Sequence, residues 1–320
     1  MWTAKRWKRS KSVSSTANQH SAPFPNRDGV AGYVGRFAPS PTGPLHMGSL
    51  STALASYLAA KANNGRWLLR IDDIDGPRAE PGASDAILAS LEAHGLLWDG
   101  PVIRQSDHLE QYRYSAEQLL SAGAAFYCRC SRAQLDSRAP YPGTCRQQQR
   151  RLADAAIRVR SFEAQVRFTD ALQGPVSTDL GATCGDFVIW RRDGLPAYQL
   201  ATAIDDGAAA ITDVVRGNDL LDSTARQLHL MALLKLSAPN YAHVPVVVDR
   251  SQTKLSKRAG AEPLDDRQPA TNLKRALVLL GVEQTSLPAT ADLPAVLAWA
   301  AQHWQLQSLR GLQSLTERDS

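Results

Sequence analysis

A strand–turn–helix near the start of the chain carries residues suited to binding a phosphate. Residues 33–38 predict a short strand, three prolines and a glycine form the turn, and residues 50–61 carry apolar residues at helical spacing. A helix that begins this way points unpaired backbone N–H groups at one spot, where His46 adds a side-chain donor. Gly48 leaves the backbone bare for a flat ring such as adenine. The alternative is a proline-stiffened turn with a surface histidine, because so short a motif is weak evidence.

A second basic segment lies far downstream. Lys254, Lys257 and Arg258 fall within five residues of a polar loop, which follows a strand predicted at 244–248. Three cations this close together are suited to meeting an anion such as a polyphosphate. Taken alone, the same segment would be an ordinary solvated basic loop.

A group of cysteines forms the third chemical feature. Cys128, Cys130 and Cys145 lie within eighteen positions, and Cys184 is the only other cysteine. The N-terminal residues lack the apolar run of a secretory signal, and disulfides are rare in reducing compartments, so we expect no disulfide. Thiolates grouped in this way suit a structural Zn²⁺, which takes four ligands in a tetrahedron. The alternative is three unmetallated cysteines in a small insertion.

The first two motifs together resemble those of class I aminoacyl-tRNA synthetases. Residues 46–49 (HMGS) resemble the HIGH element, and residues 254–258 (KLSKR) resemble the KMSKS loop. Residues 36–43 (RFAPSPTG) and 70–75 (RIDDID, against RIEDxD) narrow the resemblance to the glutamate branch. The resemblance runs from about residue 34 to residue 258. The chain departs from these patterns at Ser49, Leu255, Arg258 and Asp72.

This resemblance implies the residues that would serve ATP. They are His46, Gly48, Ser49 and Lys257, with His46, Lys254 and Lys257 as the catalytic set and Mg²⁺ on the phosphates. Fixed positive groups there would stabilise charge that develops on the phosphoryl oxygens.

The resemblance also implies a glutamate pocket. An arginine pair and a tyrosine hydroxyl neutralise a carboxylate well. Asp72 would face the α-ammonium, with a side chain about 1.5 Å shorter than the usual glutamate. The implied glutamate-binding residues are Arg36, Phe37, Ala38, Pro39, Ser40, Asp72, Tyr198 and Arg216.

The cysteine group resembles the Cys-x-Cys…Tyr-x3-Cys knuckle of glutamyl-Q tRNA(Asp) synthetases. The resemblance places Tyr141 as the fourth zinc ligand beside Cys128, Cys130 and Cys145. Tyrosine is an uncommon zinc ligand, so water in that position is the alternative.

These residues need an α/β scaffold to bring them together. A strand at 66–71 after the first helix gives a βαβ unit and hence a parallel, Rossmann-like sheet. Ligands of such sheets bind at the carboxyl ends of the strands, where Asp72 falls. We predict a disordered basic tail (1–32), two halves of the nucleotide-binding fold (33–124 and 186–260), an acceptor-type insertion with the zinc knuckle (125–185) and a small helical appendage (261–320).

Charge is distributed unevenly along the chain. The net charge is +5, and residues 1–35 carry all of this excess, so the rest is neutral overall and any RNA-binding face must be a local patch. A flexible arm that holds tRNA phosphates is the alternative to an uninvolved tail. No apolar run is long enough to span a bilayer. We expect a cytoplasmic monomer with no membrane partner.

Two enzymatic functions and one binding function fit these features. The glutamyl-Q resemblance implies activation of L-glutamate by ATP and transfer to queuosine at the wobble position of tRNA(Asp). Only 62 residues follow Arg258, fewer than the anticodon-reading region of a full glutamyl-tRNA synthetase needs, which favours this reading. The alternatives are a truncated glutamyl-tRNA synthetase that charges the tRNA 3′ end and a non-catalytic nucleotide-binding paralogue.

Overall fold

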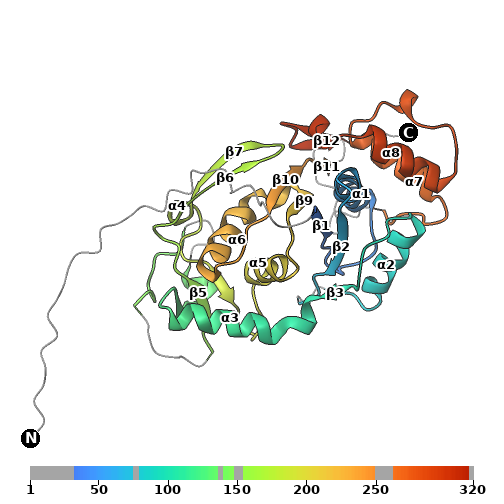
Figure 1. Ribbon diagram of the computed structural model, residues 1–320. Helices are drawn as coiled ribbons and strands as arrows, with labels where there is room; N and C mark the ends of the chain where they lie inside the picture. The colour runs from blue at the N-terminus through green and yellow to red at the C-terminus, as the bar shows by residue number, and fades with distance from the viewer. Residues whose placement is uncertain (1–31, 75–78, 136–139, 148–153, 249–261, 317–320) are drawn as a thin grey trace, which may run out of the picture.

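The computed structural model describes residues 32–74, 79–135, 140–147, 154–248 and 262–316 (Figure 1). The N-terminal tail up to residue 31 and the loop with Lys254 and Lys257 lie outside these residues. The helices are α1 (Met47–Ala62), α2 (Ala83–Ala93), α3 (Leu109–Ser121), α4 (Leu180–Thr183), α5 (Tyr198–Ala208), α6 (Leu221–Leu234), α7 (Pro269–Leu279) and α8 (Leu293–His303). The strands are β1 (Val34–Phe37), β2 (Arg66–Ile71), β3 (Ile103–Arg104), β4 (Ala125–Cys128), β5 (Ala156–Val159), β6 (Gln165–Asp170), β7 (Gly174–Asp179), β8 (Val188–Trp190), β9 (Asp213–Gly217), β10 (Asn240–Val244), β11 (Val246–Val248) and β12 (Ser314–Thr316).

The predicted parallel sheet is present. β1, β2 and β3 pair in parallel, and so do β9 and β10. Thr212 joins the two groups, because its N–H donates to the Val34 carbonyl (2.9 Å) while its Oγ1 accepts from the Val34 N–H (2.8 Å). β1 therefore lies beside β9. From β1 the sheet continues through β2 to β3 on one side, and from β9 it continues to β10 on the other. Such a switch point is where open α/β sheets bind ligands.

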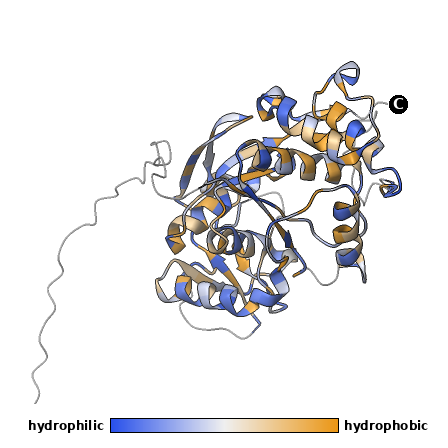
Figure 2. Ribbon diagram, turned by 45° about the vertical axis from the view of Figure 1, so that its right-hand side comes forward, coloured by the Kyte–Doolittle hydropathy of each residue, from blue (hydrophilic) through white to orange (hydrophobic). Residues whose placement is uncertain are grey.

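Two hydrophobic cores cover the two faces of this sheet. Side chains alternate between faces along a strand, so Phe37, Leu69 and Val215 pack with α1, whereas Val34 and Val214 pack with α3, α5 and α6. Polar and apolar residues lie side by side along these helices, as Figure 2 shows. In the described part of the chain, no helix is long and apolar enough to cross a membrane.

The predicted C-terminal helices form no separate core. The buried side chains of these helices belong to the same hydrophobic cluster as α1. They are Leu273 and Leu277 of α7, Val296 of α8, and Trp304 directly after α8. Both helices contact α1, at the upper right of Figure 1. α1 is therefore buried on both sides, which explains why ten of its sixteen residues are buried.

One strand expectation needs correction. We placed the start of the second half of the nucleotide-binding fold at residue 186, which would return residues 186–190 to the parallel sheet, but β8 pairs antiparallel with β5 in a small sheet β4–β5–β8. A short apolar run does not specify its partner, whereas here the buried Asp186 side chain accepts from the Ser161 and Phe162 amides and holds β8 beside β5.

Candidate active site

The turn before α1 has the features expected of a phosphate site. His46 is the N-cap of α1 in extended backbone, and its Nδ1 accepts from the Ser49 N–H (3.4 Å). A neutral His46 ring that accepts through Nδ1 carries its proton on Nε2, so the ring presents a donor from that nitrogen. Gly48 and Ser49 lie in the first turn, where helix amides lack intrahelical partners.

The flanks of the basic loop are anchored beside this turn. Pro263 forms an antiparallel bridge with His46, and the Leu264 N–H donates to the Leu45 carbonyl (2.9 Å). On the other side of the loop, β11 contacts α1 and ends at Val248. Lys254 and Lys257 belong to the intervening residues, which the structure does not describe, and the segment that follows them passes beside His46 at Pro263.

Three arginines lie at the carboxyl ends of adjacent strands and point to one face of the sheet. Each arginine follows, by two positions, an apolar residue that packs on the α5–α6 face of the sheet. The arginines are Arg36 of β1, Arg70 of β2 and Arg216 of β9. Side chains two apart on a strand share a face, so all three project toward α5. All are nearly inaccessible to solvent (3–4% exposed).

Carboxylates from β2 and α5 accompany two of these arginines. Arg70 Nε lies 2.6 Å from Asp72 Oδ1, and its Nη1 lies 2.6 Å from Asp206 Oδ1, which also meets Arg36 Nε at 3.4 Å. Burial alone would raise the pKa of Asp206, but Arg36 and Arg70 outweigh it and leave that pKa below its usual value. Asp206 is thus a fixed anion between two arginines. Asp72 is held in a fixed orientation by Arg70.

A second carboxylate on α5 ties the site to the α3 segment. Asp205 accepts from Gln105 Nε2 (2.7 Å) and from the Tyr112 hydroxyl (2.7 Å), and His108 Nδ1 lies 3.2 Å away. Arg70 Nε is 3.6 Å from the same carboxylate. This network fixes α5 against the sheet edge and leaves Asp206 as its neighbour on the ligand side.

Arg36 retains donor capacity inside the site. Its Nε bonds Asp206, whereas its two terminal NH₂ groups make no hydrogen bond to any described residue. The half-buried Tyr198, the first residue of α5, likewise has no hydroxyl partner within the described chain. These donors are therefore available to a ligand or to water.

Tyr241 is a further unsatisfied group in the same place. Its hydroxyl is buried and finds no hydrogen-bond partner among the described residues, and the Arg216 guanidinium carbon lies 5.2 Å from its ring centre. Burial raises the pKa of Tyr241, Arg216 and Arg36 lower it, and Asp206 and Tyr198 raise it. The arrangement is a polar, arginine-rich site suited to an anionic group.

The remaining predicted glutamate contacts form the turn after β1. The Phe37 side chain stacks on Trp67 on the α1 side (6.2 Å between ring centres), so only its main chain faces the arginines. Pro39 accepts from the Asp72 N–H (3.0 Å), which joins the turn to β2. Ala38 is half-buried, and Ser40 is exposed at the mouth of the site.

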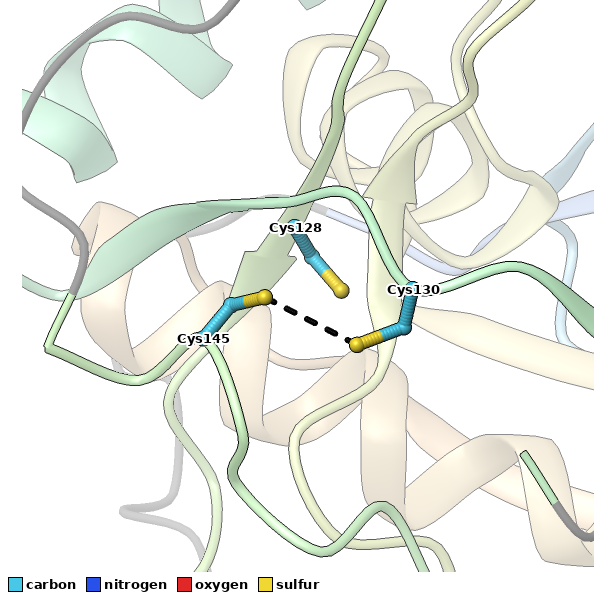
Figure 3. Close-up of side chains that lie close together, drawn as sticks. All are labelled: Cys128, Cys130 and Cys145. Carbon is cyan, nitrogen blue, oxygen red and sulfur yellow. Dashed lines mark hydrogen bonds between the residues drawn. The ribbon is translucent and has the colours of Figure 1, made fainter. Parts of the chain in front are cut away.

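The cysteine group converges as predicted. The sulfurs of Cys128, Cys130 and Cys145 lie within 4.8 Å of one another and point toward a common centre (Figure 3). Cys130 and Cys145 are 3.6 Å apart, and the Tyr141 hydroxyl lies 3.5 Å from Cys128 Sγ and 3.8 Å from Cys130 Sγ. Ligands of a tetrahedral Zn²⁺ with Zn–S bonds near 2.3 Å are separated by ~3.8 Å, so the three sulfurs and the Tyr141 oxygen fit that ion.

Gly185 explains how Tyr141 reaches this position. Its φ is +61°, and a Cβ there would lie 2.7 Å from the Tyr141 backbone nitrogen. Only glycine allows this approach, in which the Tyr141 N–H donates to the Cys184 carbonyl (3.2 Å). The Tyr141 hydroxyl then accepts from the Cys145 N–H (2.8 Å), which fixes it among the sulfurs.

Six residues that organise the arginines were not predicted as site residues from the sequence. They are Arg70, Asp170, Asp205, Asp206, Tyr241 and His243. A partial signal was present, since Arg70 and Arg216 are polar residues within otherwise apolar strands. Their partners lie up to 136 residues away along the chain, however, and no local pattern predicts that pairing.

Comparison with known proteins places the chain. The family model of the class I tRNA synthetases (E and Q), catalytic domain, matches residues 33–287. The chain belongs to this family. It is 50% identical over 289 residues to the glutamyl-Q tRNA(Asp) synthetase of Pseudomonas aeruginosa, covering 90% of this chain and 99% of that one. The Methylococcus capsulatus protein of the same name is 46% identical over 89% of this chain and 95% of its own length.

Among solved structures of the family, a glutamate tRNA ligase from Elizabethkingia meningosepticum in complex with its amino acid superposes with a TM-score of 0.75. It is 26% identical and is matched over 89% of this chain and 67% of its own. The class I synthetase catalytic fold is therefore shared at levels of both sequence and structure.

Proposed function

We propose that this class I synthetase activates L-glutamate with ATP and transfers it to queuosine in the anticodon of tRNA(Asp), in the cytoplasm. The observation that carries the amino-acid specificity is the arginine pair at the switch point. Arg216 is 3% exposed and has no carboxylate partner within 4.0 Å in the described chain, while Arg36 keeps its terminal NH₂ groups unbonded there. A buried guanidinium needs an anion, and the side-chain carboxylate of glutamate supplies one.

The pocket also predicts rejection of glutamine. An amide between Arg36 and Arg216 would leave positive charge uncompensated, and its NH₂ group would face guanidinium donors. A site built around a polar contact discriminates strongly against an analogue that cannot make that contact. This discrimination is far larger than that of an apolar pocket between two ligands that differ by one methylene group. At the other end of the substrate, Asp72 would accept from the α-ammonium, with Ala38 and Ser40 beside it.

In the first step the α-carboxylate oxygen attacks the α-phosphorus of ATP, and pyrophosphate leaves with the electrons of the broken P–O bond. The α1 N-terminus and His46 are placed to stabilise charge on the phosphoryl oxygens, and Lys254 and Lys257 would approach the leaving group. Mg²⁺ on the phosphates supplies further charge neutralisation. The bridge between His46 and Pro263, which follows the loop, supports this arrangement.

In the second step a hydroxyl attacks the carbonyl of the mixed anhydride and AMP leaves. The cyclopentenediol of queuosine offers a cis-diol, as the terminal ribose of tRNA does, so one catalytic core suits either acceptor. The named relatives favour queuosine: alignment covers 99% of the P. aeruginosa glutamyl-Q tRNA(Asp) synthetase but 67% of the Elizabethkingia glutamate ligase. The alternative remains charging of the tRNA 3′ end.

We further propose that Cys128, Cys130, Tyr141 and Cys145 hold a structural Zn²⁺. The support is the donor set and its spacing: three sulfurs within 4.8 Å and a phenol oxygen among them. The ion would hold β4 and the following loop together, at a position away from the arginines of the sheet.

The function is tested in two stages with the full chain. We expect glutamate-dependent ATP–pyrophosphate exchange without tRNA, and none with glutamine. We then expect labelled glutamate to be transferred to tRNA(Asp) that contains queuosine and not to the same tRNA transcribed without it. Absence of exchange would leave only a binding function, and equal transfer to both tRNAs would favour 3′-end charging.

A further inference from the structure

The Arg216 guanidinium is held by neutral groups. Its Nε donates to His243 Nε2 (3.1 Å), Nη1 to Gln227 Oε1 (2.8 Å) and Nη2 to Thr224 Oγ1 (2.7 Å). The Leu220 carbonyl lies 3.4 Å from Nη2. The Nε bond is the one that depends on a titratable partner, since a histidine nitrogen accepts only when it carries no proton.

Asp170 decides which His243 nitrogen carries the proton. Its Oδ2 lies 2.6 Å from His243 Nδ1, and its Oδ1 accepts from the N–H groups of Leu172 and Gln173 (both 2.9 Å). A carboxylate can only accept, so Nδ1 carries the hydrogen and the Nε2 lone pair faces Arg216. Burial alone would raise the pKa of Asp170, but the bonds from His243 and the two amides outweigh it and keep that pKa low.

The surroundings of His243 favour this neutral form. Burial lowers the pKa of His243, and Arg216 and Arg36 lower it further, against the opposing effect of Asp170. Tyr241 stacks on the ring (5.9 Å between centres, 9° between planes) and restricts its rotation. The charged and titratable groups that face the ring are therefore Asp170 from β6, Arg216 from β9, Arg36 from β1 and Tyr241 from its own strand.

We propose that Asp170 and His243 are positioning residues for the amino acid: by fixing the Nδ1–H tautomer they orient Arg216 toward the substrate carboxylate. This inference rests on the proposed function, since it concerns the same glutamate pocket. With the other tautomer, the His243 Nε2–H would donate to Thr224 Oγ1, which lies 3.1 Å away, and the Arg216 Nε–H would lose its acceptor and its fixed orientation. Binding of the amino acid would suffer, while ATP binding at α1 would not.

Asp170→Asn tests this with almost no change of shape. The amide oxygen retains the bonds from the Leu172 and Gln173 amides, which forces the NH₂ group toward His243 Nδ1. That nitrogen must then accept, and the proton moves to Nε2. An asparagine in this position can cost a histidine its working tautomer without disturbing geometry.

The experiment measures exchange kinetics of wild type and Asp170→Asn. We expect KM for glutamate to rise about 10- to 100-fold, the loss of one charge-assisted contact, with KM for ATP unchanged. Asp186→Asn is the matched control, because Asp186 is also buried, accepts from two backbone amides through Oδ1 and from Arg146 through Oδ2 (2.7 Å). If losing a buried carboxylate had only a general cost, both variants would show a lower Tm, and neither would show a raised KM for glutamate beside an unchanged KM for ATP.

A double-mutant cycle isolates the tautomer. The glutamine of His243→Gln offers Arg216 an acceptor oxygen and has no tautomer to switch, so adding Asp170→Asn to it should raise KM for glutamate less than twofold further. An undiminished effect of Asp170→Asn in that background would overturn the inference.

Nitrogen-15 NMR of wild type labelled at histidine provides a readout that needs no folded variant at residue 170. We expect the His243 signals to be those of a neutral ring protonated at Nδ1. These signals are assigned to His243 because they disappear in His243→Gln. A ring protonated at Nε2, or charged at neutral pH, would refute the inference. If wild type shows no glutamate-dependent exchange at all, the proposed function fails, whereas normal exchange with an unchanged KM in Asp170→Asn refutes only the positioning role.

Discussion

Replacing Arg36 by methionine should separate glutamate binding from folding. Within the described chain the Arg36 side chain makes one hydrogen bond, from Nε to Asp206 Oδ1 at 3.4 Å, and Asp206 keeps its shorter contact with Arg70 at 2.6 Å. Losing one such bond costs about 1 kcal/mol, or a fall in Tm of ~2–4 °C. The buried methionine would fill much of the same volume.

The cost in the complex is much larger. A glutamate carboxylate would lose the two terminal NH₂ groups of Arg36, and breaking a buried ion pair by removing one partner costs about 3–5 kcal/mol. This predicts a loss of roughly 10²- to 10⁴-fold in kcat/KM for glutamate in the exchange assay, with KM for ATP little changed.

The matched control is Arg66→Met, at the exposed start of the neighbouring strand β2. It removes the same side chain from the same sheet at the opposite strand end, so its exchange kinetics should equal those of wild type. The reasoning would be refuted if folded Arg36→Met kept kcat/KM for glutamate within about threefold of wild type, or if Arg66→Met lost as much.

Four shorter predictions concern other parts of the molecule. Tyr241→Phe removes only the buried hydroxyl that has no partner in the described chain; KM for glutamate should rise about 3- to 10-fold with Tm unchanged or higher, and an unchanged KM would show that the hydroxyl does not meet the substrate. Cys130→Ser should abolish zinc binding, measured by elemental analysis, and lower Tm; a wild-type protein free of zinc would contradict the proposed site. Lys257→Ala should slow adenylation about 10²-fold or more at constant Tm, and normal exchange would refute the role of that loop. Burial lowers the pKa values of His229 and His243, so the unfolded chain takes up protons at a higher pH than the folded chain does. The unfolding free energy should therefore fall between pH 6.5 and 5.5, by up to about 1.4 kcal/mol for each histidine. A urea melt showing greater stability at pH 5.5 would contradict this sign.

Local sequence patterns predicted the elements that carry the site. The strand at 66–71 has the predicted bounds, and the helix predicted over residues 50–61 lies within α1. Such segments are defined by apolar periodicity and by the prolines and glycines that end them, both of which are local properties. The cysteine group was predictable for a similar reason, because spacing along the chain constrained which sulfurs could meet.

The organisation of the charged residues was not predictable in this way. Arg70 was read as part of a motif, yet its guanidinium joins Asp72 to Asp206, which lies 136 residues downstream. His243 and Asp170 are 73 residues apart and meet only because β6 and β10 pair. Strand pairing is decided by tertiary packing, so neither the partner of β8 nor the return of β12 to β11 followed from residue patterns.

The attachment point of glutamate is the measurement that tests the account most directly. Queuosine-containing tRNA(Asp) would be charged with labelled glutamate by the full chain and digested with an RNase that separates the anticodon fragment from the 3′-terminal adenosine, with a tRNA charged at its 3′ end as the reference. The account predicts that the label remains with the anticodon fragment. Label released with the terminal adenosine would contradict it.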